Sequence, residues 1–267
     1  MISSEVHTQH ATRSTSIESI FYLKDQVALI TGGSRGIGRA IAEIFAQAGA
    51  RVALVARDRA RLAETAAQLR AKGYAVLDCA CDVAVEAEVN TTVQAVVAQF
   101  GRVDILVNNA GILQAGPITN FTTADWEQVL AVNLTSVFHF CRAVAPPFIE
   151  QRSGRIINIS SVTAQSGGVS GSVQYSASKG GMLSLTKTLA RDLAPYNVTV
   201  NAICPGQIET EMGALTGEAR QRVLEMIPLH RMGTPQDIAF TALFLASAAA
   251  SYITGATIDV NGGILKR

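Results

Sequence analysis

Residues 27–38, with the sequence VALITGGSRGIG, decide the fold of this chain. Val27–Ile30 is an apolar, β-branched run that predicts a buried strand, and the glycines after it predict a tight turn. Apolar residues then recur at helical spacing at Ile37, Ile41, Ile44, Phe45 and Ala48, and Gly49 ends the helix. At such a turn the free N–H groups and the dipole of the helix favour a phosphate. A glycine-rich turn alone is weak evidence, but this placement favours phosphate binding over an ordinary turn.

The alternation of apolar runs and helical stretches continues along the chain. It predicts strands at Val27–Ile30, Arg51–Ala56, Ala75–Cys79, Asp104–Asn108, Arg155–Ile159, Val198–Ile203 and Thr257–Val260. Nearly continuous apolar strands that alternate with helices are typical of a parallel sheet covered on both faces. We therefore expect a single doubly wound α/β domain of the Rossmann type, with about seven strands, over residues 23–267.

Two segments fall outside this regular pattern. Residues 1–22 are rich in Ser and Thr, and we expect them to form an N-terminal extension outside the fold. They lack the apolar run of a secretory signal, while an organelle transit peptide stays open as an alternative. Residues 207–232 should form a helical lid over the substrate pocket, with Met212, Leu215, Met226 and Leu229 as its apolar candidates. The last helix should begin at a capping box of Thr234, Pro235 and Asp237.

The composition excludes several classes of partner. Hydrophobic residues make up 48% of the 267 residues and charged residues 16%, with a net charge of +1. This balance provides no field that would attract nucleic acid or a membrane surface, and no stretch approaches the roughly 20 apolar residues that cross a bilayer. The spacing of Cys79, Cys81, Cys141 and Cys204 matches neither a redox nor a zinc pattern. We expect buried thiols in a cytoplasmic protein, no metal site and a small-molecule substrate.

Several motifs resemble those of the short-chain dehydrogenase/reductase family. The turn from Thr31 to Gly38 has that family's T-G-x-x-x-G-x-G pattern. Asp82-Val83 resembles its adenine-binding dipeptide, Asn108–Gly111 its N-N-A-G motif, and Pro205-Gly206 with Thr210 its P-G-x-x-x-T segment. The order of these motifs, each after a predicted strand, is far more specific than any one of them. The resemblance covers about residue 23 to the C-terminus and implies cofactor contacts from Gly32, Ser34, Arg35, Gly36, Ile37, Gly38, Arg57, Asp82, Val83, Asn109, Ala110, Gly111, Tyr175, Lys179, Pro205, Gly206, Ile208 and Thr210.

The end of the second predicted strand indicates which nicotinamide cofactor is bound. An NAD enzyme carries an acidic residue there, whereas this chain has Ala56 followed by Arg57. A guanidinium can hold a 2′-phosphate through two hydrogen bonds, and Arg35 is a second cation near the same place. We therefore expect NADP(H). Two alternatives stay open: the arginines are merely solvated, or Asp58 points inward and restores NAD preference instead of capping the next helix.

Four residues are candidates for catalysis. Tyr175 and Lys179 are four apart, so on a helix both side chains share one face. A phenol has a pKa of about 10, which a neighbouring ammonium lowers, so that Tyr175 can exchange a proton with the substrate oxygen. The resemblance implies that Ser161 binds that oxygen, with Ser160 as the competitor. It also implies that Asn133, unusual in mid-helix, positions a proton-relaying water near Lys179.

Within the family, the chain is most similar to bacterial 3-oxoacyl-[acyl-carrier-protein] reductases. Arg152–Arg155 and Glu209–Met212 fit that subgroup, in which two arginines near the active-site entrance grip the carrier protein. Arg152 matches the first arginine, but Tyr196 stands at the position of the second. An acyl thioester is therefore one expectation, and a sugar, polyol, steroid or small alcohol is another. A non-catalytic cofactor sensor is a third hypothesis, which the intact catalytic set disfavours. The resemblance further implies a homotetramer.

Overall fold

The apolar runs form one parallel sheet in the computed structural model, which describes residues 17–167 and 172–266. Its seven strands lie in the order β3-β2-β1-β4-β5-β6-β7. They are β1 (Val27–Thr31), β2 (Arg51–Ala56), β3 (Val76–Ala80), β4 (Ile105–Asn108), β5 (Gly154–Ile159), β6 (Val198–Pro205) and β7 (Thr257–Val260). The expected doubly wound α/β fold is thus confirmed.

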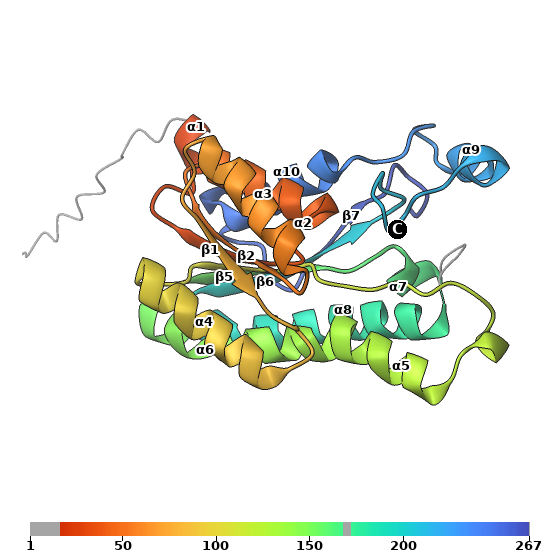
Figure 1. Ribbon diagram of the computed structural model, residues 1–267. Coiled ribbons are helices and arrows are strands. Elements are labelled where there is room, and N and C mark those ends of the chain that lie inside the picture. The colour runs from red at the N-terminus through yellow and green to blue at the C-terminus, as the bar shows by residue number, and fades with distance from the viewer. Residues whose placement is uncertain (1–16, 168–171, 267) are drawn as a thin grey trace, which may run out of the picture.

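Helices cover both faces of the sheet (Figure 1). One layer holds α2 (Gly36–Gln47), α3 (Arg59–Ala71) and α10 (Pro235–Ala246), and the other holds α4 (Glu86–Phe100), α5 (Thr123–Leu130), α6 (Ser136–Gln151) and α8 (Val173–Leu193). The other α-helices of the described residues are α1 (Ile17–Ile20), α7 (Thr163–Ser166) and α9 (Gly217–Met226). Successive strand residues point to opposite faces, so Ile30 packs with Phe45 and Ile238 on one side while Leu29 packs with Phe140 on the other.

The strand order fixes where a ligand can bind. β1 pairs with β2 on one side and with β4 on the other, so the direction of the chain's progress through the sheet reverses at β1. In open α/β sheets such a reversal leaves a crevice beyond the carboxyl ends of the strands, because the following helices go to opposite faces. The glycine-rich turn follows β1 and therefore lies at this crevice.

Element boundaries differ from the sequence prediction by a residue or two. β3 is shifted by one residue, and β6 continues to Pro205. Asp104 lies outside β4 because its carboxylate accepts a hydrogen bond from the backbone N–H of Val27 (2.9 Å), which fixes the start of β1. The capping box at Thr234 and Asp237 is confirmed, and so is the cap by Asp58, which accepts from the Arg61 N–H at 3.1 Å.

Two further segments bear on the organisation of the chain. Residues 1–16 of the expected extension lie outside the described residues, and full burial begins at Leu23. Within the described residues, one helix, Thr123–Gln151, is long and apolar enough to span a membrane by length and composition. It contributes the fully buried Phe140 and Phe148 to the core, whereas its Phe138 is 49% exposed.

Candidate active site

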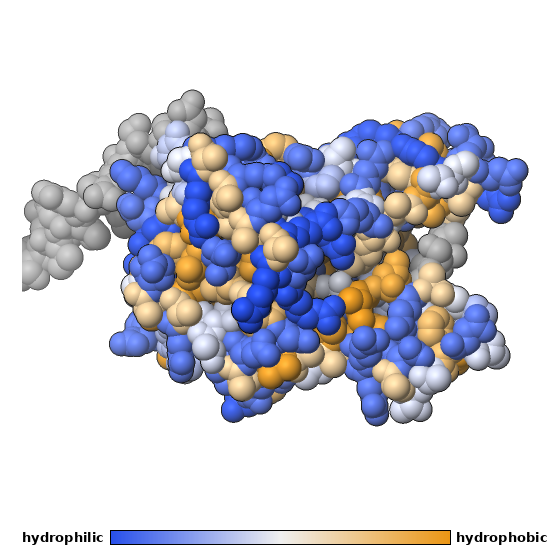
Figure 2. Space-filling view, in the orientation of Figure 1, coloured by the Kyte–Doolittle hydropathy of each residue, from blue (hydrophilic) through white to orange (hydrophobic). Residues whose placement is uncertain are grey.

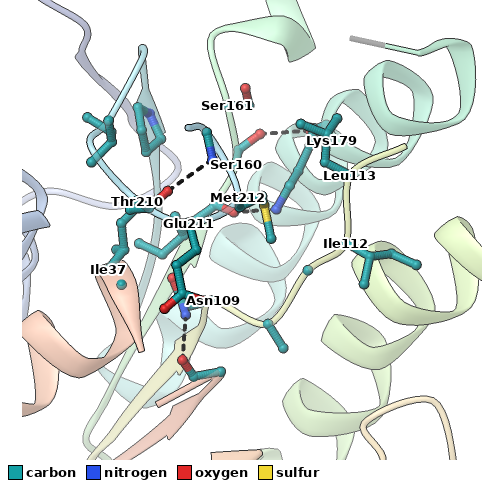
Figure 3. A pocket seen from close by; sticks show the side chains of 18 of the residues that line it. Ile37, Asn109, Ile112, Leu113, Ser160, Ser161, Lys179, Thr210, Glu211 and Met212 are labelled. Carbon is teal, nitrogen blue, oxygen red and sulfur yellow. Dashed lines mark hydrogen bonds between the residues drawn. The ribbon is translucent and has the colours of Figure 1, made fainter. Parts of the chain in front are cut away.

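A cavity of about 850 Å³ opens at the carboxyl ends of the central strands. It extends from the glycine-rich turn, past the ends of β4 and β5, to α8 and to the segment between β6 and α9. Figure 3 shows side chains converging on it from all of these elements. A cavity of this size and length can hold a dinucleotide together with a small substrate.

Glycine is required in the turn after β1. Gly32 and Gly36 have φ values of +65° and +52°, and a Cβ atom on Gly38 would lie closer than 3.0 Å to the Gly32 carbonyl. The turn therefore brings its backbone to the N-terminus of α2, with no side chain between that helix end and the cavity at Gly36. Thr65 secures the turn by donating to the Ser34 carbonyl at 2.9 Å. This geometry fits a pyrophosphate at the helix N-terminus.

The segment after β4 is tied to the same turn. The Asn109 side chain donates to the carbonyl oxygens of Thr31 (2.9 Å) and Gly32 (3.3 Å). The Thr31 hydroxyl accepts from the backbone N–H groups of Asn109 and Ala110, at 2.9 and 3.0 Å. Asn108 instead bonds inward to Asn158 on β5, at 2.9 Å. These contacts join the ends of β1, β4 and β5 beside the cavity.

Most of the expected cofactor residues line the cavity. Gly38 and Asp82 do not: Gly38 supports the turn from behind, and Asp82 pairs with Arg57 at 3.8 Å. The remaining residues of the set are in the cavity wall, namely Gly32, Ser34, Arg35, Gly36, Ile37, Arg57, Val83, Asn109, Ala110, Gly111, Tyr175, Lys179, Pro205, Gly206, Ile208 and Thr210. The cavity wall thus contains arginine side chains, glycine backbone and apolar side chains, which together suit a nicotinamide dinucleotide.

Three of the expected catalytic residues meet at the deep end of the cavity. Tyr175 and Lys179 come from α8 and Ser161 follows β5. Lys179 is buried, its Nζ lies 5.9 Å from the centre of the Tyr175 ring, and it donates to the Ile159 carbonyl at 2.7 Å. Helical spacing and the end of one strand therefore bring a phenol, an ammonium and a hydroxyl together.

The two serines after β5 have different surroundings. The Ser160 hydroxyl donates to the backbone carbonyl of Lys179 at 2.9 Å. The Ser161 hydroxyl hydrogen-bonds with Tyr175 and donates to the hydroxyl of Thr163 at 3.0 Å. The Thr163 N–H also donates to the Ser161 oxygen, at 3.1 Å. Ser161 is thus the serine that stands beside the phenol. Thr163, which the sequence analysis did not single out, holds it there.

Burial governs the protonation of this group. Desolvation raises the pKa of the Tyr175 phenol, and the hydrogen bond with Ser161 opposes this only in part. The lysine was expected to lower that pKa, but in the protein alone burial outweighs any such effect. Desolvation also lowers the pKa of Lys179 to about 8, so at neutral pH the ammonium form still dominates. Burial raises the pKa of the adjacent Cys204 thiol and keeps it neutral.

Asn133 lies behind the cavity wall. It sits in a π-helical turn, Ala131–Thr135, between α5 and α6, a distortion that recurs at functional sites. Its side chain accepts from the Ile112 N–H (2.8 Å) and donates to the Ile112 carbonyl (2.9 Å) and to Ser178 (3.2 Å). A Cβ atom on Gly111 would lie 3.3 Å from the Asn133 oxygen and 3.7 Å from the Lys179 Nζ. Asn133 therefore positions the backbone next to Lys179.

Charged residues gather at the opposite end of the cavity. Arg35, Arg57 and Arg61 line it, and Glu211 accepts from both Arg35 (2.8 Å) and Arg61 (2.9 Å). Asp58 also lines the cavity, and one of its carboxylate oxygens caps α3 by accepting from the Arg61 N–H at 3.1 Å. Figure 2 shows hydrophilic residues near the centre of this face and apolar residues to their right. The sequence analysis missed Arg61, and it included Glu211 only in the stretch Glu209–Met212 that fits the reductase subgroup, without a role.

Segment 207–232 borders the cavity only in part. Met212 and Met226 line it, whereas Leu215 does not, and Leu229 lines a separate cavity beside β7. Helix α9 accounts for the helical character that was expected there.

Arg152 does not line the cavity of its own chain. Arg152 precedes β5, whereas the cavity lies beyond the carboxyl end of that strand, and Arg152 donates to the Pro195 carbonyl at 3.1 Å. A strand of six residues spans roughly 20 Å, which separates Arg152 from the entrance. The sequence match did not reveal which edge of the sheet the residue occupies.

Comparison with known proteins agrees with this site. Residues 32–265 match the family described as enoyl-(acyl carrier protein) reductase. The chain is 44% identical to the 3-oxoacyl-[acyl-carrier-protein] reductase FabG of Aquifex aeolicus over 244 residues, 91% of this chain and 98% of that protein. The FabG of Vibrio cholerae is 41% identical over 243 residues, again 91% and 98% of the two chains. A short-chain type dehydrogenase/reductase from Mycobacterium marinum superposes with a TM-score of 0.89 at 34% identity, over 93% of this chain and 98% of its own.

These relatives and the cavity lead to one assignment. The similarity runs through the glycine-rich turn, the catalytic helix and the C-terminal strand, so no large part of the fold lies outside it. The chain therefore belongs to the short-chain dehydrogenase/reductase family and is a nicotinamide-dependent oxidoreductase.

Proposed function

We propose that this enzyme uses NADP(H) to interconvert a carbonyl and a secondary alcohol, with 3-oxoacyl thioesters as the leading substrate class. The observation that carries the proposal is the meeting of Ser161, Tyr175 and Lys179 in the wall of a cavity whose other end is the glycine-rich turn. A protein that only senses the cofactor does not require a phenol, a buried ammonium and a hydroxyl at one place in the cavity, so the non-catalytic hypothesis is less well supported.

The cofactor would lie along the cavity from the arginines to α8. The turn from Gly32 to Ile37 would hold its pyrophosphate, Val83 its adenine, and the Pro205–Thr210 segment its nicotinamide end. When bound, the nicotinamide supplies or accepts the hydride. The chain's own residues supply orientation, proton transfer and exclusion of water.

Tyr175 acts as the proton donor in reduction. Its raised pKa keeps the phenol protonated at neutral pH, which is the form that can donate to a carbonyl oxygen. The Ser161 hydroxyl has one hydrogen, which turns from Thr163 to the substrate and donates a second hydrogen bond to that oxygen as negative charge develops on it. Lys179 holds one N–H on the Ile159 carbonyl, which leaves its others for the nicotinamide ribose and for the electrostatics around the phenol.

Asn133 supports this group from behind. Its amide fixes the backbone of Ile112 and contacts Ser178 on the catalytic helix. We assign it to the positioning of Gly111 and Lys179, together with a water that relays protons to the lysine. The π-helical turn supports this role because it is kept at the cost of regular helix hydrogen bonding.

The substrate end of the cavity supports an apolar substrate. Its apolar lining residues are Ile112, Leu113, Met212 and Met226, whose side chains offer a sugar or polyol no hydrogen bond stronger than a weak one to a methionine sulfur. The polar residues Ser166, Gln207 and Glu209 also line the cavity. The names of the similar FabG proteins point the same way, toward a 3-oxoacyl group on a carrier. Binding of the carrier protein itself has weaker support, since Arg152 is distant from the entrance and Tyr196 replaces the second arginine.

The choice of NADP(H) rests on the charged end. Ala56 leaves no carboxylate at the end of β2, and Arg57 and Arg35 line the cavity there. Asp58, the residue that could have restored NAD preference, caps α3. These observations favour a cofactor with an additional phosphate on its adenosine ribose.

Assembly as a homotetramer in the cytoplasm completes the proposal. Phe138 and Phe240 are 49% and 58% exposed on α6 and α10, which supports apolar contacts between subunits. All four cysteines are free thiols, as expected for a reducing compartment. Light scattering coupled to gel filtration measures the mass of the assembly, and a monomer would contradict the tetramer.

An assay of NADPH and NADH consumption tests the function. The panel contains 3-oxoacyl thioesters of increasing chain length, cyclic and linear ketones, and keto sugars. We expect the highest kcat/KM for an apolar 3-oxoacyl thioester with NADPH. Turnover of keto sugars alone would overturn the substrate class, and equal use of NADH would overturn the cofactor assignment.

A further inference from the structure

Glu211 is a carboxylate from the segment between β6 and α9 that reaches two arginines on other elements. One of its oxygens accepts from Arg35 at 2.8 Å and from Arg61 at 2.9 Å, and its other oxygen also pairs with Arg61. Figure 3 shows Glu211 entering the pocket from the segment that carries Thr210 and Met212. All three charged residues line the cavity.

The two guanidinium groups come from different parts of the cofactor site. Arg35 is the residue before α2, in the glycine-rich turn, and Arg61 lies in the first turn of α3. They are separated from Glu211 by 176 and 150 residues of sequence. Two guanidinium groups that converge on one pair of carboxylate oxygens form an anion site, with the fork geometry that also binds phosphate.

We infer that Glu211 determines cofactor selectivity because it occupies the guanidinium groups that a 2′-phosphate requires. This inference rests on the proposed use of NADP(H). NAD(H) has a hydroxyl at that position and can leave the contact between Glu211 and the two arginines intact. NADP(H) must displace the carboxylate or share the arginines with it, and the like charges then repel.

Exposure sets the size of the effect. The side chains of Arg35, Arg61 and Glu211 are 53%, 36% and 56% exposed, so water and salt screen their interactions. Exposed ion pairs of this kind typically change an affinity by a factor of about two to five. Glu211 is therefore expected to moderate NADP(H) affinity rather than to abolish it.

The contact also links the two sides of the cavity. While Glu211 holds both arginines, the segment between β6 and α9 is tied to the glycine-rich turn and to α3. Displacement of the carboxylate by a 2′-phosphate removes that tie and leaves the segment with its remaining contacts, such as the one between Gly233 N–H and the Gln207 carbonyl at 2.9 Å. The choice between NADP(H) and NAD(H) is thereby coupled to the number of contacts that hold the segment between β6 and α9.

Binding of two small nucleotides isolates the 2′-phosphate from catalysis. Adenosine 2′,5′-bisphosphate carries it and AMP does not, and isothermal titration calorimetry measures both on the intact protein. For Glu211→Gln we expect the bisphosphate to bind about three- to fivefold more tightly, with AMP changed by less than a factor of two. The gain should shrink in 0.5 M salt, where the screening length is only about 4 Å.

Glu209→Gln is the matched control. It removes the same charge from the same segment, but Glu209 pairs with Arg220 on α9 at 2.7 Å and not with the two arginines. We expect no change in the ratio of the two affinities. Arg61→Met should weaken the bisphosphate selectively, and thermal melting verifies that each variant is folded.

The outcomes distinguish a failure of the role inferred for Glu211 from a failure of the proposed use of NADP(H). If the unaltered protein binds AMP as tightly as the bisphosphate, the proposed NADP(H) preference fails. If it prefers the bisphosphate but Glu211→Gln tightens both ligands equally, Glu211 opposes the shared 5′-phosphate and the selectivity role is wrong. Weaker or unchanged binding of the bisphosphate to Glu211→Gln would likewise overturn the inference.

Discussion

The two ends of the cavity differ in how far their charged side chains are exposed to water and in the charge of the groups around them. At the catalytic end Lys179 is 3% exposed and its surroundings are neutral hydrogen-bonding groups. At the charged end the side chains of Arg57 and Glu211 are each 56% exposed and face groups of opposite charge. Water weakens every interaction at the second end, whereas desolvation amplifies those at the first.

This difference determines how each end responds to substitution. At the buried end no water replaces a hydrogen bond that a substitution removes. A substitution that shifts a pKa there also changes whether the group is protonated. At the exposed end water and ions take over part of any lost interaction. We therefore expect large, specific effects on turnover at the first end and smaller, salt-dependent effects on cofactor affinity at the second.

The largest expected effect is that of Tyr175→Phe. Loss of the phenol removes the proposed proton donor, and general acid catalysis contributes about 10²- to 10⁴-fold to rate. We expect kcat to fall by about a thousandfold, measured by NADPH consumption, while NADPH binding measured by its fluorescence is retained. Tyr196→Phe, on the opposite edge of the sheet, is the control and should be fully active. Retained turnover in Tyr175→Phe would remove this residue from the mechanism.

Lys179 should make stability depend on pH. Its pKa is lowered from 10.5 to about 8 in the folded protein, so between these values the unfolded chain binds more protons than the folded one. The contribution of Lys179 to the free energy of unfolding should then rise with pH across this window, by about 3 kcal/mol at most, and it is lost below pH 8. The four cysteines oppose this trend above their ordinary pKa, because burial raises their pKa values in the folded protein, so the Lys179 contribution is measured as a difference from a variant. Tyr175 opposes the trend only above its ordinary pKa of 10, because its folded-state pKa is raised.

Denaturant unfolding of Lys179→Met at pH 8 and at pH 10 measures this contribution. The variant has no group to titrate at this position, so the unaltered protein should gain stability relative to it as the pH rises. Lys187→Met, which removes an exposed lysine of the same helix, should follow the unaltered protein. Parallel pH dependence in the unaltered protein and Lys179→Met would show that the ammonium is not desolvated.

Thr163 should affect turnover without contacting the phenol. Its hydroxyl accepts from the Ser161 hydroxyl and its N–H donates to the Ser161 oxygen, so it holds that oxygen in place beside the phenol. Thr163→Val keeps the shape and the N–H contact, and we expect kcat to fall by about tenfold with KM for the cofactor unchanged. Thr163→Ser should restore the rate. In the Ser161→Ala background Thr163→Val should cost nothing further, and additive losses would contradict the proposed coupling.

Sequence patterns predicted the buried end better than the exposed end, for a physical reason. Tyr175 and Lys179 meet through helical periodicity, and Ser161 lies at the end of a recognisable strand, so local rules suffice there. The contacts of Glu211 join residues 150 and 176 positions apart, and no local pattern encodes them. A motif match likewise carries no information on the edge of the sheet that Arg152 occupies, which is the edge before β5. The raised pKa of Tyr175 depends on burial, which only the packed structure defines.

The smallest expected effect is that of Arg57→Ala, which directly tests the exposed end of the cavity. Arg57 lines the cavity but also lies 3.8 Å from Asp82, so part of its charge is already compensated. We expect kcat/KM to fall by about three- to tenfold with NADPH and by less than twofold with NADH, because only the former carries a phosphate for the guanidinium to hold. The loss should diminish at high salt, unlike that in Tyr175→Phe.

Arg59→Ala removes an exposed arginine two residues away that does not line the cavity, and it should leave both values unchanged. Equal losses with both cofactors would mean that Arg57 senses the shared part of the dinucleotide, and the electrostatic account of NADP(H) preference would then have to rest on Arg35 and Arg61 alone.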